Sequence, residues 1–139
     1  MPDCIFCQII KGKLPCAKVY EDDRVISFLD INPVNAGHTL VVPKKHAETL
    51  LDISEEDLQA CTLVAGRLAK AVFRGTNAVG LNFLQNNFRP AGQHIGHIHF
   101  HLIPRYPQDH FLTSWPAKPY QQGEIDRVLK KIRAECDNL

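Results

Sequence analysis

Three histidines at alternate positions are the residues of this sequence with the clearest chemical potential. They are His97, His99 and His101, in the segment His-Ile-His-Phe-His-Leu-Ile-Pro. Because successive side chains of a β-strand point to opposite faces, the three imidazoles would share one face and the apolar residues between them would face the core. Threonine or valine would suit an ordinary strand surface better. Three solvated surface histidines are therefore the less favoured interpretation, and a functional site is the better one.

The chemistry open to this histidine row (His97, His99 and His101) is limited by its spacing. At about 3.3 Å per residue, His97 and His101 start roughly 13 Å apart, too far for both to reach one ion through bonds of about 2.0–2.1 Å. At most two neighbours could share a metal. A neutral imidazole is also a good nucleophile near pH 7, and its bond to phosphorus can later be cleaved by water. Attack requires one unprotonated ring nitrogen, so we expect the other nitrogen to donate to an acceptor such as a backbone carbonyl.

The elements that must position these residues follow from the residue pattern. Short β-branched and aromatic runs predict strands at residues 18–21, 25–29, 38–43, 80–86 and 97–104. A capping-box-like start at Ser54 predicts a long helix to about Arg74, Asp3 would cap a short N-terminal helix, and a last helix is expected from about Gln122 to Cys136. Strands in hairpin order with the helices set apart from them indicate an α+β domain, and we expect one domain over residues 1–139.

Composition narrows the partners and the compartment. Sixteen Lys and Arg against fifteen Asp and Glu give a formal charge of +1, which supplies no bulk field for nucleic acid or an anionic membrane. Five cysteines, an odd number spread along the chain, favour a reducing compartment over a disulfide framework. We find no apolar run long enough to cross a bilayer. These features predict a soluble, cytoplasmic protein.

Several motifs together identify a family resemblance. The histidine segment fits His-φ-His-φ-His-φ-φ, where φ is apolar, and it follows Phe-Leu-Asp-Ile-Asn-Pro at 28–33, Gly-His-Thr-Leu-Val-Val-Pro-Lys-Lys-His at 37–46 and the loop 86–93. Over about residues 4–105 the sequence resembles the histidine triad (HIT) family of nucleotide hydrolases and transferases. The resemblance implies a five-stranded antiparallel sheet with a long helix and a short N-terminal helix, and a dimer with one continuous sheet. Residues 106–139 would form a C-terminal extension.

The resemblance also implies roles around the phosphate. His99 would attack the α-phosphorus and become transiently nucleotidylated, and His101 would contact the phosphate oxygens. His38 would support the histidine row from a neighbouring strand, and Asp30 would hold the ribose hydroxyls. At position 94 the family usually carries a hydroxyl residue, whereas this sequence has His94, which could donate a proton to the leaving group or could turn away.

Two further groups complete the implied nucleotide site. The phosphate loop corresponds to Asn86, Gly92 and Gln93, where side-chain amides and backbone N–H groups would stabilise developing charge. The base pocket corresponds to four apolar residues: Phe6, Ile9, Phe28 and Ile31. An apolar and aromatic slot accepts any base face with little hydrogen-bond discrimination. Any one of these four residues considered alone would be assigned to the core.

A structural zinc site is the expected cofactor. The Cys4-x-x-Cys7 pair supplies half of a tetrahedral site, and the resemblance implies His46 and His97 as the other two ligands. A closed Cys2His2 set would be structural and would leave His99 and His101 for phosphate chemistry. The alternative is two reduced cysteines that pack as small apolar residues on a helix face.

The favoured function is hydrolysis that releases a nucleoside monophosphate, with adenine as the expected base. A phosphoramidate or a dinucleoside polyphosphate would be the substrate, through a nucleotidyl-His99 intermediate. The Leu-Ile-Pro-Arg segment that ends at Arg105 is more similar to the dinucleoside-polyphosphate branch, and the motif at 28–33 is compatible with either branch. The alternatives are a nucleotide-binding sensor or scaffold with little catalysis, and a metal-dependent hydrolase that uses the histidine row.

Overall fold

The chain forms two compact units in the computed structural model, which describes residues 3–111 and 114–139. The N-terminal unit is Met1–Asp109 and the C-terminal unit is His110–Leu139. The boundary lies four residues beyond Arg105, where the motif-bearing region was expected to end. The N-terminal unit contains every residue that the sequence assigns to a site.

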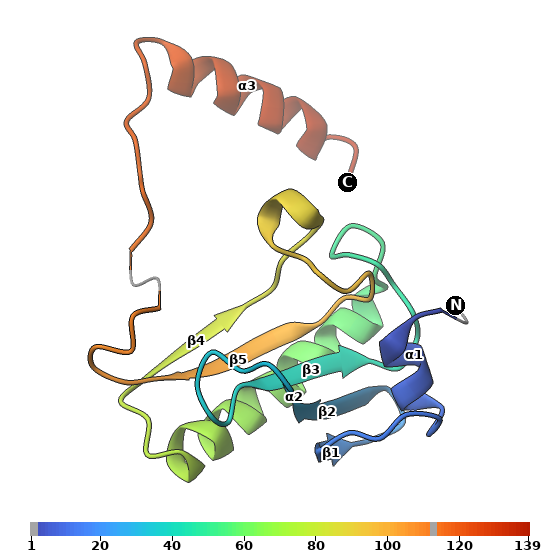
Figure 1. Cartoon of the computed structure of the whole chain (residues 1–139). Helices are drawn as coiled ribbons and strands as arrows, with labels where there is room; N and C mark the ends of the chain where they lie inside the picture. Colours follow the sequence, from blue (N-terminus) through green and yellow to red (C-terminus); the bar gives the residue numbers. More distant parts are fainter. Residues whose placement is uncertain (1–2, 112–113) are drawn as a thin grey trace. The chain divides into compact units, whose positions relative to one another are not determined.

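A five-stranded antiparallel sheet forms the centre of the N-terminal unit (Figure 1). Its strands in chain order are β1 (Lys18–Glu21), β2 (Val25–Leu29), β3 (Thr39–Pro43), β4 (Gly80–Leu84) and β5 (Phe100–Arg105). Their order in the sheet is β1-β2-β3-β5-β4, and all four neighbouring pairs are antiparallel. The α+β fold with a five-stranded antiparallel sheet is thus confirmed.

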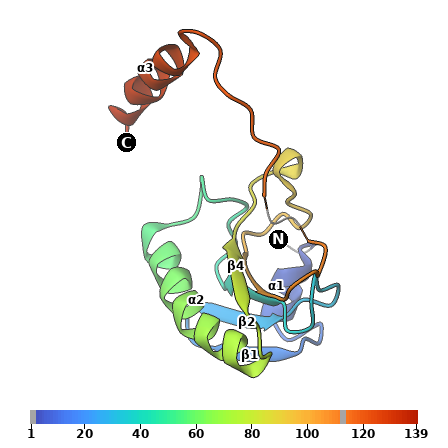
Figure 2. The same ribbon diagram turned by 90° about the vertical axis from the view of Figure 1, so that its left-hand side faces the viewer.

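Two helices cover opposite faces of this sheet (Figure 2). The long helix α2 spans Glu55–Gly75, and its N-cap Ser54 accepts a hydrogen bond from the Asp57 backbone N–H, as the capping pattern predicted. The short helix α1 spans Ile5–Ile10. Its N-cap is Cys4, whose sulfur accepts from the Cys7 N–H, so the expectation that Asp3 caps this helix is wrong. The capping atom is therefore one that also belongs to the Cys-x-x-Cys pair.

The apolar core is divided by the sheet into two layers. The layer beneath α2 contains Val41, Ile98, Phe100 and Leu102 with helix residues such as Val64. The layer beneath α1 consists mainly of the following residues: Phe6, Ile26, Phe28, Leu40 and Val42. Period-two alternation explains this division, since neighbours in a strand face opposite sides. The predicted core face of the histidine segment is confirmed, and the histidine row faces the α1 side.

The histidine row does not lie wholly within a strand. The sequence predicted a strand over 97–104, whereas β5 begins only at Phe100. His97 and His99 precede it in a segment where the Ile98 N–H donates to Ala47 O at 2.8 Å. Ala47 follows the end of β3, so this bond holds the segment beside the chain that leaves β3. The row therefore keeps its common face while its first two members lie in less regular backbone.

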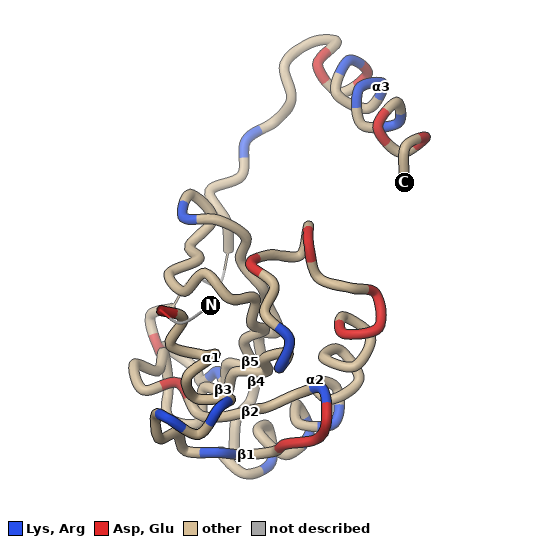
Figure 3. Tube along the Cα trace, turned by 90° about the vertical axis from the view of Figure 1, so that its right-hand side faces the viewer, with Lys and Arg blue, Asp and Glu red and all other residues tan. Residues whose placement is uncertain are grey.

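The C-terminal unit has no core of its own among its described residues. Its helix α3 spans Glu124–Cys136, two residues shorter at its start than predicted, and contains no buried residue. Trp115 is exposed. Lys and Arg as well as Asp and Glu occur along the trace of both units (Figure 3), with only acidic charges at residues 48–57 and only basic charges at residues 67–105. Within the described residues, we find no helix with the length and apolarity needed to span a membrane.

Candidate functional site

Two members of the histidine row are buried: His97 has no exposed surface and His99 retains 8%. His101 is half-buried. The ring of Phe6, on α1, meets the His99 ring edge-on at 5.1 Å between centroids, and the centroid of the His101 ring lies 4.9 Å from that of His99. The row is thus enclosed by aromatic neighbours, and the interpretation as solvated surface histidines is wrong.

The hydrogen bond of His99 determines which of its nitrogens is reactive. Its Nδ1 lies 2.7 Å from the backbone carbonyl oxygen of His97. A carbonyl oxygen only accepts, so we assign the ring proton to Nδ1, which donates to it. In the neutral ring, Nε2 then carries a lone pair. This is the carbonyl acceptor that a nucleophilic imidazole requires.

A chain of hydrogen bonds sets the tautomers of His38 and His101. The Val34 backbone N–H donates to His38 Nδ1 at 3.1 Å, so the proton of a neutral His38 ring lies on Nε2. His38 Nε2 lies 2.9 Å from His101 Nδ1 and donates to it. The proton of His101 is therefore on Nε2, where it can be donated to an oxygen of a ligand. This series of hydrogen bonds begins at the Val34 N–H and leaves the His101 Nε2–H as a donor for a ligand.

Burial keeps these imidazoles neutral. Desolvation lowers the pKa of His101 to about 4, with smaller contributions from His99 and His38. Desolvation also lowers the pKa of His38 and of His99, although the carboxylate of Asp30 opposes both shifts. His94 contributes to the lowered pKa of His99, which places it within electrostatic reach of that ring. A neutral His99 at pH 7 is the form that can attack.

A second group of side chains, the Cys–His cluster, has donor atoms that converge on one point. Its members are Cys4, Cys7, His46 and His97, and the donor atoms all lie within 4.8 Å of one another. His97 Nδ1 lies 3.4 Å from Cys4 Sγ, 3.6 Å from Cys7 Sγ and 3.1 Å from His46 Nδ1, and Cys7 Sγ lies 3.3 Å from His46 Nδ1. With Zn–N bonds of about 2.0–2.1 Å and Zn–S bonds of about 2.3 Å, tetrahedral ligands lie about 3.3–3.8 Å apart. The four donors fit a tetrahedral ion.

The protonation of His97 also fits a metal ligand. Its Nε2 lies 2.8 Å from the carbonyl oxygen of Pro43 and donates to it, so the Nδ1 lone pair points into the Cys–His cluster. Burial lowers the pKa of His97 to about 4, which keeps the ring in the neutral form that binds metals. Burial raises the pKa of the Cys7 thiol, and the neighbouring Cys4 raises it further. A cation is what would hold both sulfurs as thiolates.

A second set of potential ligands, Asp30, His38 and His101, is less suited to a metal. Their donor atoms also lie within 4.8 Å of one another. However, His38 accepts the Val34 N–H at Nδ1, so its Nε2 bears a proton and faces the other members of the set. Metal binding there would require a proton to be lost and the hydrogen bond between the two imidazoles to be broken. The distances favour a hydrogen-bonded group over a metal site.

The four residues expected to form the base pocket are only partly together. Phe6 and Phe28 make an edge-on contact with ring centroids 5.4 Å apart, and Ile9 packs against the same apolar layer. Ile31 is 89% exposed and stands outside that layer. Phe6 and Phe28 are themselves buried, so both also serve the core. The assignment of all four to a base pocket stays a prediction.

The expected phosphate loop is tightly folded. Gly92 has a φ of +94°, and a side chain there would press on the Asn86 amide. The Gln93 side chain is buried, accepts from the Phe88 N–H at 2.7 Å and donates to the Glu48 carbonyl at 2.6 Å. One end of its amide thus holds the loop and the other ties it to the chain that follows β3, and a phosphate contact from this side chain stays a prediction. His94 is exposed.

Sequence reasoning missed three residues that hydrogen-bond to one another near the site. Asn35, Arg105 and Asp109 form a hydrogen-bonded group at the end of β5. Arg105 drew attention only as part of the Leu-Ile-Pro-Arg segment. Nothing in the local pattern links Asn35 to residues about 70 positions later, so the partnership is visible only in the fold.

Known proteins match this arrangement along most of the chain. The HIT domain model matches residues 11–108. The chain belongs to the HIT family. Among curated relatives, the adenosine 5′-monophosphoramidase of Schizosaccharomyces pombe is 38% identical over 133 residues, covering 95% of this chain and 97% of that protein. The adenylylsulfatase of Arabidopsis thaliana is 41% identical over 140 residues, covering 99% and 71%.

Solved structures of HIT proteins agree with this fold. A HIT family member from Bacillus subtilis has a TM-score of 0.88 at 38% identity and covers 95% of this chain and 96% of its own. A zinc-bound histidine triad family protein from Mycobacterium smegmatis has a TM-score of 0.74 at 34% identity, covering 99% and 97%. The family resemblance drawn from the sequence motifs is therefore confirmed. A zinc-bound relative also accords with the metal-compatible geometry of the Cys–His cluster.

Proposed function

We propose that this HIT protein is a nucleotide hydrolase that releases a nucleoside monophosphate, most simply AMP, through a nucleotidyl-His99 intermediate. The observation that carries the proposal is the 2.7 Å hydrogen bond from His99 Nδ1 to the His97 carbonyl, because it leaves Nε2 as a free base. Relatives named for adenosine 5′-monophosphoramidase and adenylylsulfatase activity support an adenylyl substrate. Phosphoramidates and dinucleoside polyphosphates are the substrate classes we propose.

The reaction proceeds in two displacements. His99 Nε2 attacks the α-phosphorus, a nitrogen–phosphorus bond forms, and the bond from phosphorus to the leaving group breaks. His101 donates from Nε2–H to an equatorial oxygen and stabilises the charge that develops there, while His38 holds its ring. Water then attacks the same phosphorus, releases the monophosphate and regenerates His99. Asp30 holds the ribose hydroxyls, and the leaving group takes its proton from His94, His101 or water.

Zinc belongs to the proposal as a structural cofactor held by Cys4, Cys7, His46 and His97. When bound, it would neutralise the two thiolates and fix α1 against the segment that precedes β5. The chain's own residues perform the chemistry: His97 supplies its carbonyl to His99, and Phe6 packs against the His99 ring. Each residue of α1 with a proposed role therefore depends on how firmly that helix is held.

The wider setting is proposed from the same features. β4 lies at the edge of the sheet, and Val79 and Phe83 at or beside it are exposed, which supports pairing with a second copy into a continuous sheet. All five cysteines are free, which supports a reducing, cytoplasmic setting. We propose a purine nucleotide and a second copy of this chain as partners, and neither nucleic acid nor a membrane.

Trapping the intermediate tests the function. Rapid mixing with adenosine 5′-phosphoramidate followed by acid quench should give a protein that carries one adenylyl group on His99, seen by intact mass spectrometry and peptide mapping. His99→Ala should lower turnover by roughly a thousandfold or more and leave AMP affinity within about threefold, since it removes the nucleophile but little of the pocket. If the wild type released no AMP from phosphoramidate, phosphosulfate or diadenosine polyphosphate, a binding or sensing role would replace this proposal.

A further inference from the structure

The loop between β2 and β3, residues 30–38, carries three groups that the proposed reaction uses: Asp30, Ile31 and His38. The loop is closed on itself, because the Asp30 N–H donates to His38 O at 2.9 Å and the His38 N–H donates to Asn35 O at 3.0 Å. The Val34 N–H that sets the tautomer of His38 comes from the same loop. The position of the loop as a whole therefore determines where the Asp30 carboxylate and the His38 ring lie.

One side chain of the loop ties it to the strand that bears His101. Asn35 Nδ2 donates to the carbonyl oxygen of Pro104 at 2.8 Å and to Asp109 Oδ2 at 2.9 Å. Pro104 lies in β5, three residues after His101. Both hydrogens of a single amide nitrogen are thus used on the far end of the histidine-bearing strand. Asn35 fixes the spacing between the loop and β5.

The acceptor that Asn35 meets is itself held rigidly. Arg105 donates to Asp109 from Nε at 2.7 Å and from Nη2 at 2.6 Å, and the Tyr106 N–H donates to the same carboxylate at 3.1 Å. The two charged side chains are only 11% and 8% exposed, so the pair is poorly screened by solvent. Arg105 also donates from Nη1 to Asn82 Oδ1 in β4 at 2.7 Å. Bidentate arginine–carboxylate pairs combine strength with a fixed geometry.

The other side of the loop is confined as well. Gly37 has a φ of +97°, and a Cβ there would collide with the side-chain methyl group of Thr76. The Thr76 carbonyl in turn accepts from the hydroxyl of Tyr106, the residue that follows Arg105. The loop is thus restrained at two points: at Gly37, where only glycine fits against Thr76, and at Asn35, which bonds to Pro104 and Asp109. Small changes at either point would displace Asp30.

We propose that Asn35, Arg105 and Asp109 are positioning residues of the nucleotide site, which we call the loop anchor. They hold residues 30–38 at the end of β5 so that Asp30 meets the ribose hydroxyls and His38 meets His101. None of the three touches the reacting atoms. The inference rests on the proposed function, because it needs a nucleotide whose ribose lies against Asp30.

The test compares two substrates in the full-length protein. Adenosine 5′-phosphoramidate carries both ribose hydroxyls, and its 2′,3′-dideoxy counterpart carries neither. Asn35→Ala should lower the kcat/KM preference for the ribose substrate by about tenfold, the equivalent of one charge-assisted hydrogen bond. Most of that change should come from KM. In the background of Asp30→Ala, the same substitution should change the preference by less than about twofold, since the ribose contact is already lost.

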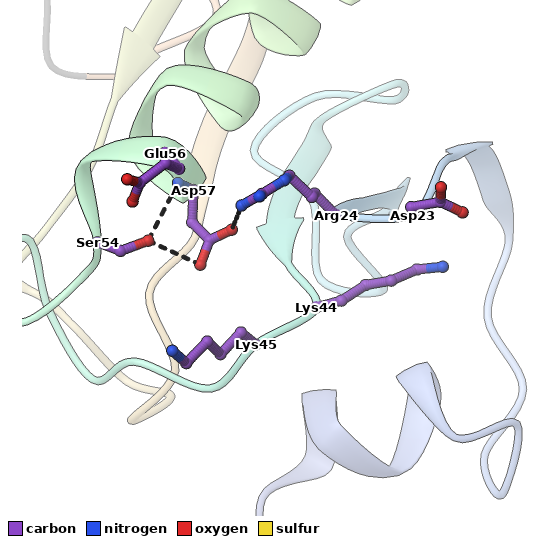
Figure 4. Close-up of a pocket in the computed structure, with 7 residues that line it drawn as sticks. All are labelled: Asp23, Arg24, Lys44, Lys45, Ser54, Glu56 and Asp57. Atoms are coloured by element: carbon purple, nitrogen blue, oxygen red, sulfur yellow. Dashed lines mark hydrogen bonds and ion pairs between the residues drawn. The ribbon is translucent and has the colours of Figure 1, made fainter.

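Two further variants separate positioning from general stability. Asp109→Asn keeps the volume and one acceptor oxygen, so it should fold and show a smaller loss of ribose preference than Asn35→Ala. The matched control is Asp57→Asn, because Asp57 at the start of α2 also pairs with an arginine, Arg24, at 2.9 Å. This pair belongs to a pocket that no residue of the loop 30–38 lines (Figure 4). The control should lower the unfolding temperature and leave the ribose preference within about twofold.

The outcomes distinguish the anchor from the function. If Asn35→Ala reduced kcat/KM equally for both substrates, or lowered only the unfolding temperature as Asp57→Asn does, the loop anchor would be structural and the inference wrong. If it acted undiminished in the Asp30→Ala background, the route through Asp30 would be wrong. Absence of turnover in the wild type with either substrate would overturn the proposed function itself, a result no anchor variant can mimic.

Discussion

Two clusters of histidines lie on one face of the sheet, and they differ in which ring nitrogen a protein group holds. In the Cys–His cluster, His97 donates a hydrogen bond from Nε2 to the Pro43 carbonyl, and its Nδ1 faces two sulfurs. In the neighbouring imidazole cluster (His38, His99 and His101), His99 donates a hydrogen bond from Nδ1 to the His97 carbonyl, which leaves the lone pair on Nε2. His97 and His99 are two residues apart in one segment. The comparison shows that the ring nitrogen that bonds to a backbone carbonyl, Nε2 in His97 and Nδ1 in His99, distinguishes a candidate metal ligand from a candidate nucleophile.

The surroundings of the two clusters explain this difference. The Cys–His cluster is closed by α1 and by the chain that follows β3, which bring two thiols and His46 to His97. The imidazole cluster has no thiol, and its hydrogen bonds run from the Val34 N–H through His38 to His101. The first set has four converging ligand atoms that suit a cation, whereas the second has alternating hydrogen-bond donors and acceptors. One is therefore expected to govern stability and the other catalysis.

Cys7→Ser should produce the largest change on the structural side of this comparison. The variant should lose zinc and lower the unfolding temperature by about 10 °C or more, because binding energy at a structural metal site is folding energy. Zinc content per chain by atomic spectroscopy and thermal unfolding by circular dichroism would measure it. Cys136→Ser is the matched control, since Cys136 is exposed on α3 and should keep both values unchanged.

Removing zinc with a chelator allows the structural and catalytic effects to be followed over time. As zinc is withdrawn, backbone amides of residues 5–10 should exchange faster by hydrogen–deuterium exchange, and turnover should fall in step with that loosening. If turnover were lost at once while these amides stayed protected, the metal would act in catalysis. The Cys–His cluster would then not be purely structural. His99→Ala should, in contrast, retain its zinc and its unfolding temperature.

Burial of neutral His101 in the imidazole cluster should make the protein less stable at low pH. The pKa of His101 is about 4 in the folded protein, because of burial, against about 6.5 in an unfolded chain. Between these values the unfolded chain binds more protons, so stability is full above about pH 6.5 and is lost as the pH falls toward 4. In zinc-loaded protein, His101→Asn should reduce the loss of unfolding temperature between pH 7 and pH 5 by about 5 °C.

The control for this pH effect is His110→Asn, since His110 is exposed in the C-terminal unit. That variant should follow the wild type throughout. An unchanged pH dependence in His101→Asn would mean that the ring is not buried as neutral imidazole in solution, and the proposed donor to the phosphate would be lost with it.

His94 should produce the smallest effect, because its side chain is exposed at the rim of the imidazole cluster. If it donates a proton to the leaving group, His94→Ser should lower kcat/KM for a phosphoramidate by about fivefold and for a dinucleoside polyphosphate by less, since a departing amine needs a proton more than a departing phosphate does. The ratio of the two rate constants is the measurement. Equal losses with both substrates would assign His94 to general packing of the loop.

The sequence predicted the features that depend on local periodicity and on motif order. Alternation along residues 97–102 correctly placed Ile98, Phe100 and Leu102 in the core and the histidines on the other face. The four members of the Cys–His cluster were assigned together and are found together. The low exposure of His97 and His99 agrees with the preference for a functional site over solvated surface histidines, although the short helix that covers them has few local signals in the sequence.

Features that depend on backbone hydrogen bonds across the fold escaped prediction. The acceptor for His99 is the carbonyl two residues earlier, which becomes available only because the regular strand starts at Phe100. Asn35 meets Asp109 across 74 residues of sequence, and neither residue has a pattern that points to the other. Gln93 matched a phosphate-contacting motif, yet its amide bonds to Phe88 in its own loop and to Glu48 beyond β3. Such partners are set by tertiary geometry and leave no local trace.

Helix α1 has only six residues, and such a length is not stable by itself in water. Its order therefore depends on tertiary contacts: Cys7 and the N-cap Cys4 belong to the proposed zinc site, and Phe6 and Ile9 belong to the proposed base pocket. Zinc binding and nucleotide binding should then be coupled, because the ligand that binds first orders the helix and the second no longer loses that conformational entropy. The supply of a trace metal would in this way set how avidly the protein captures its substrate.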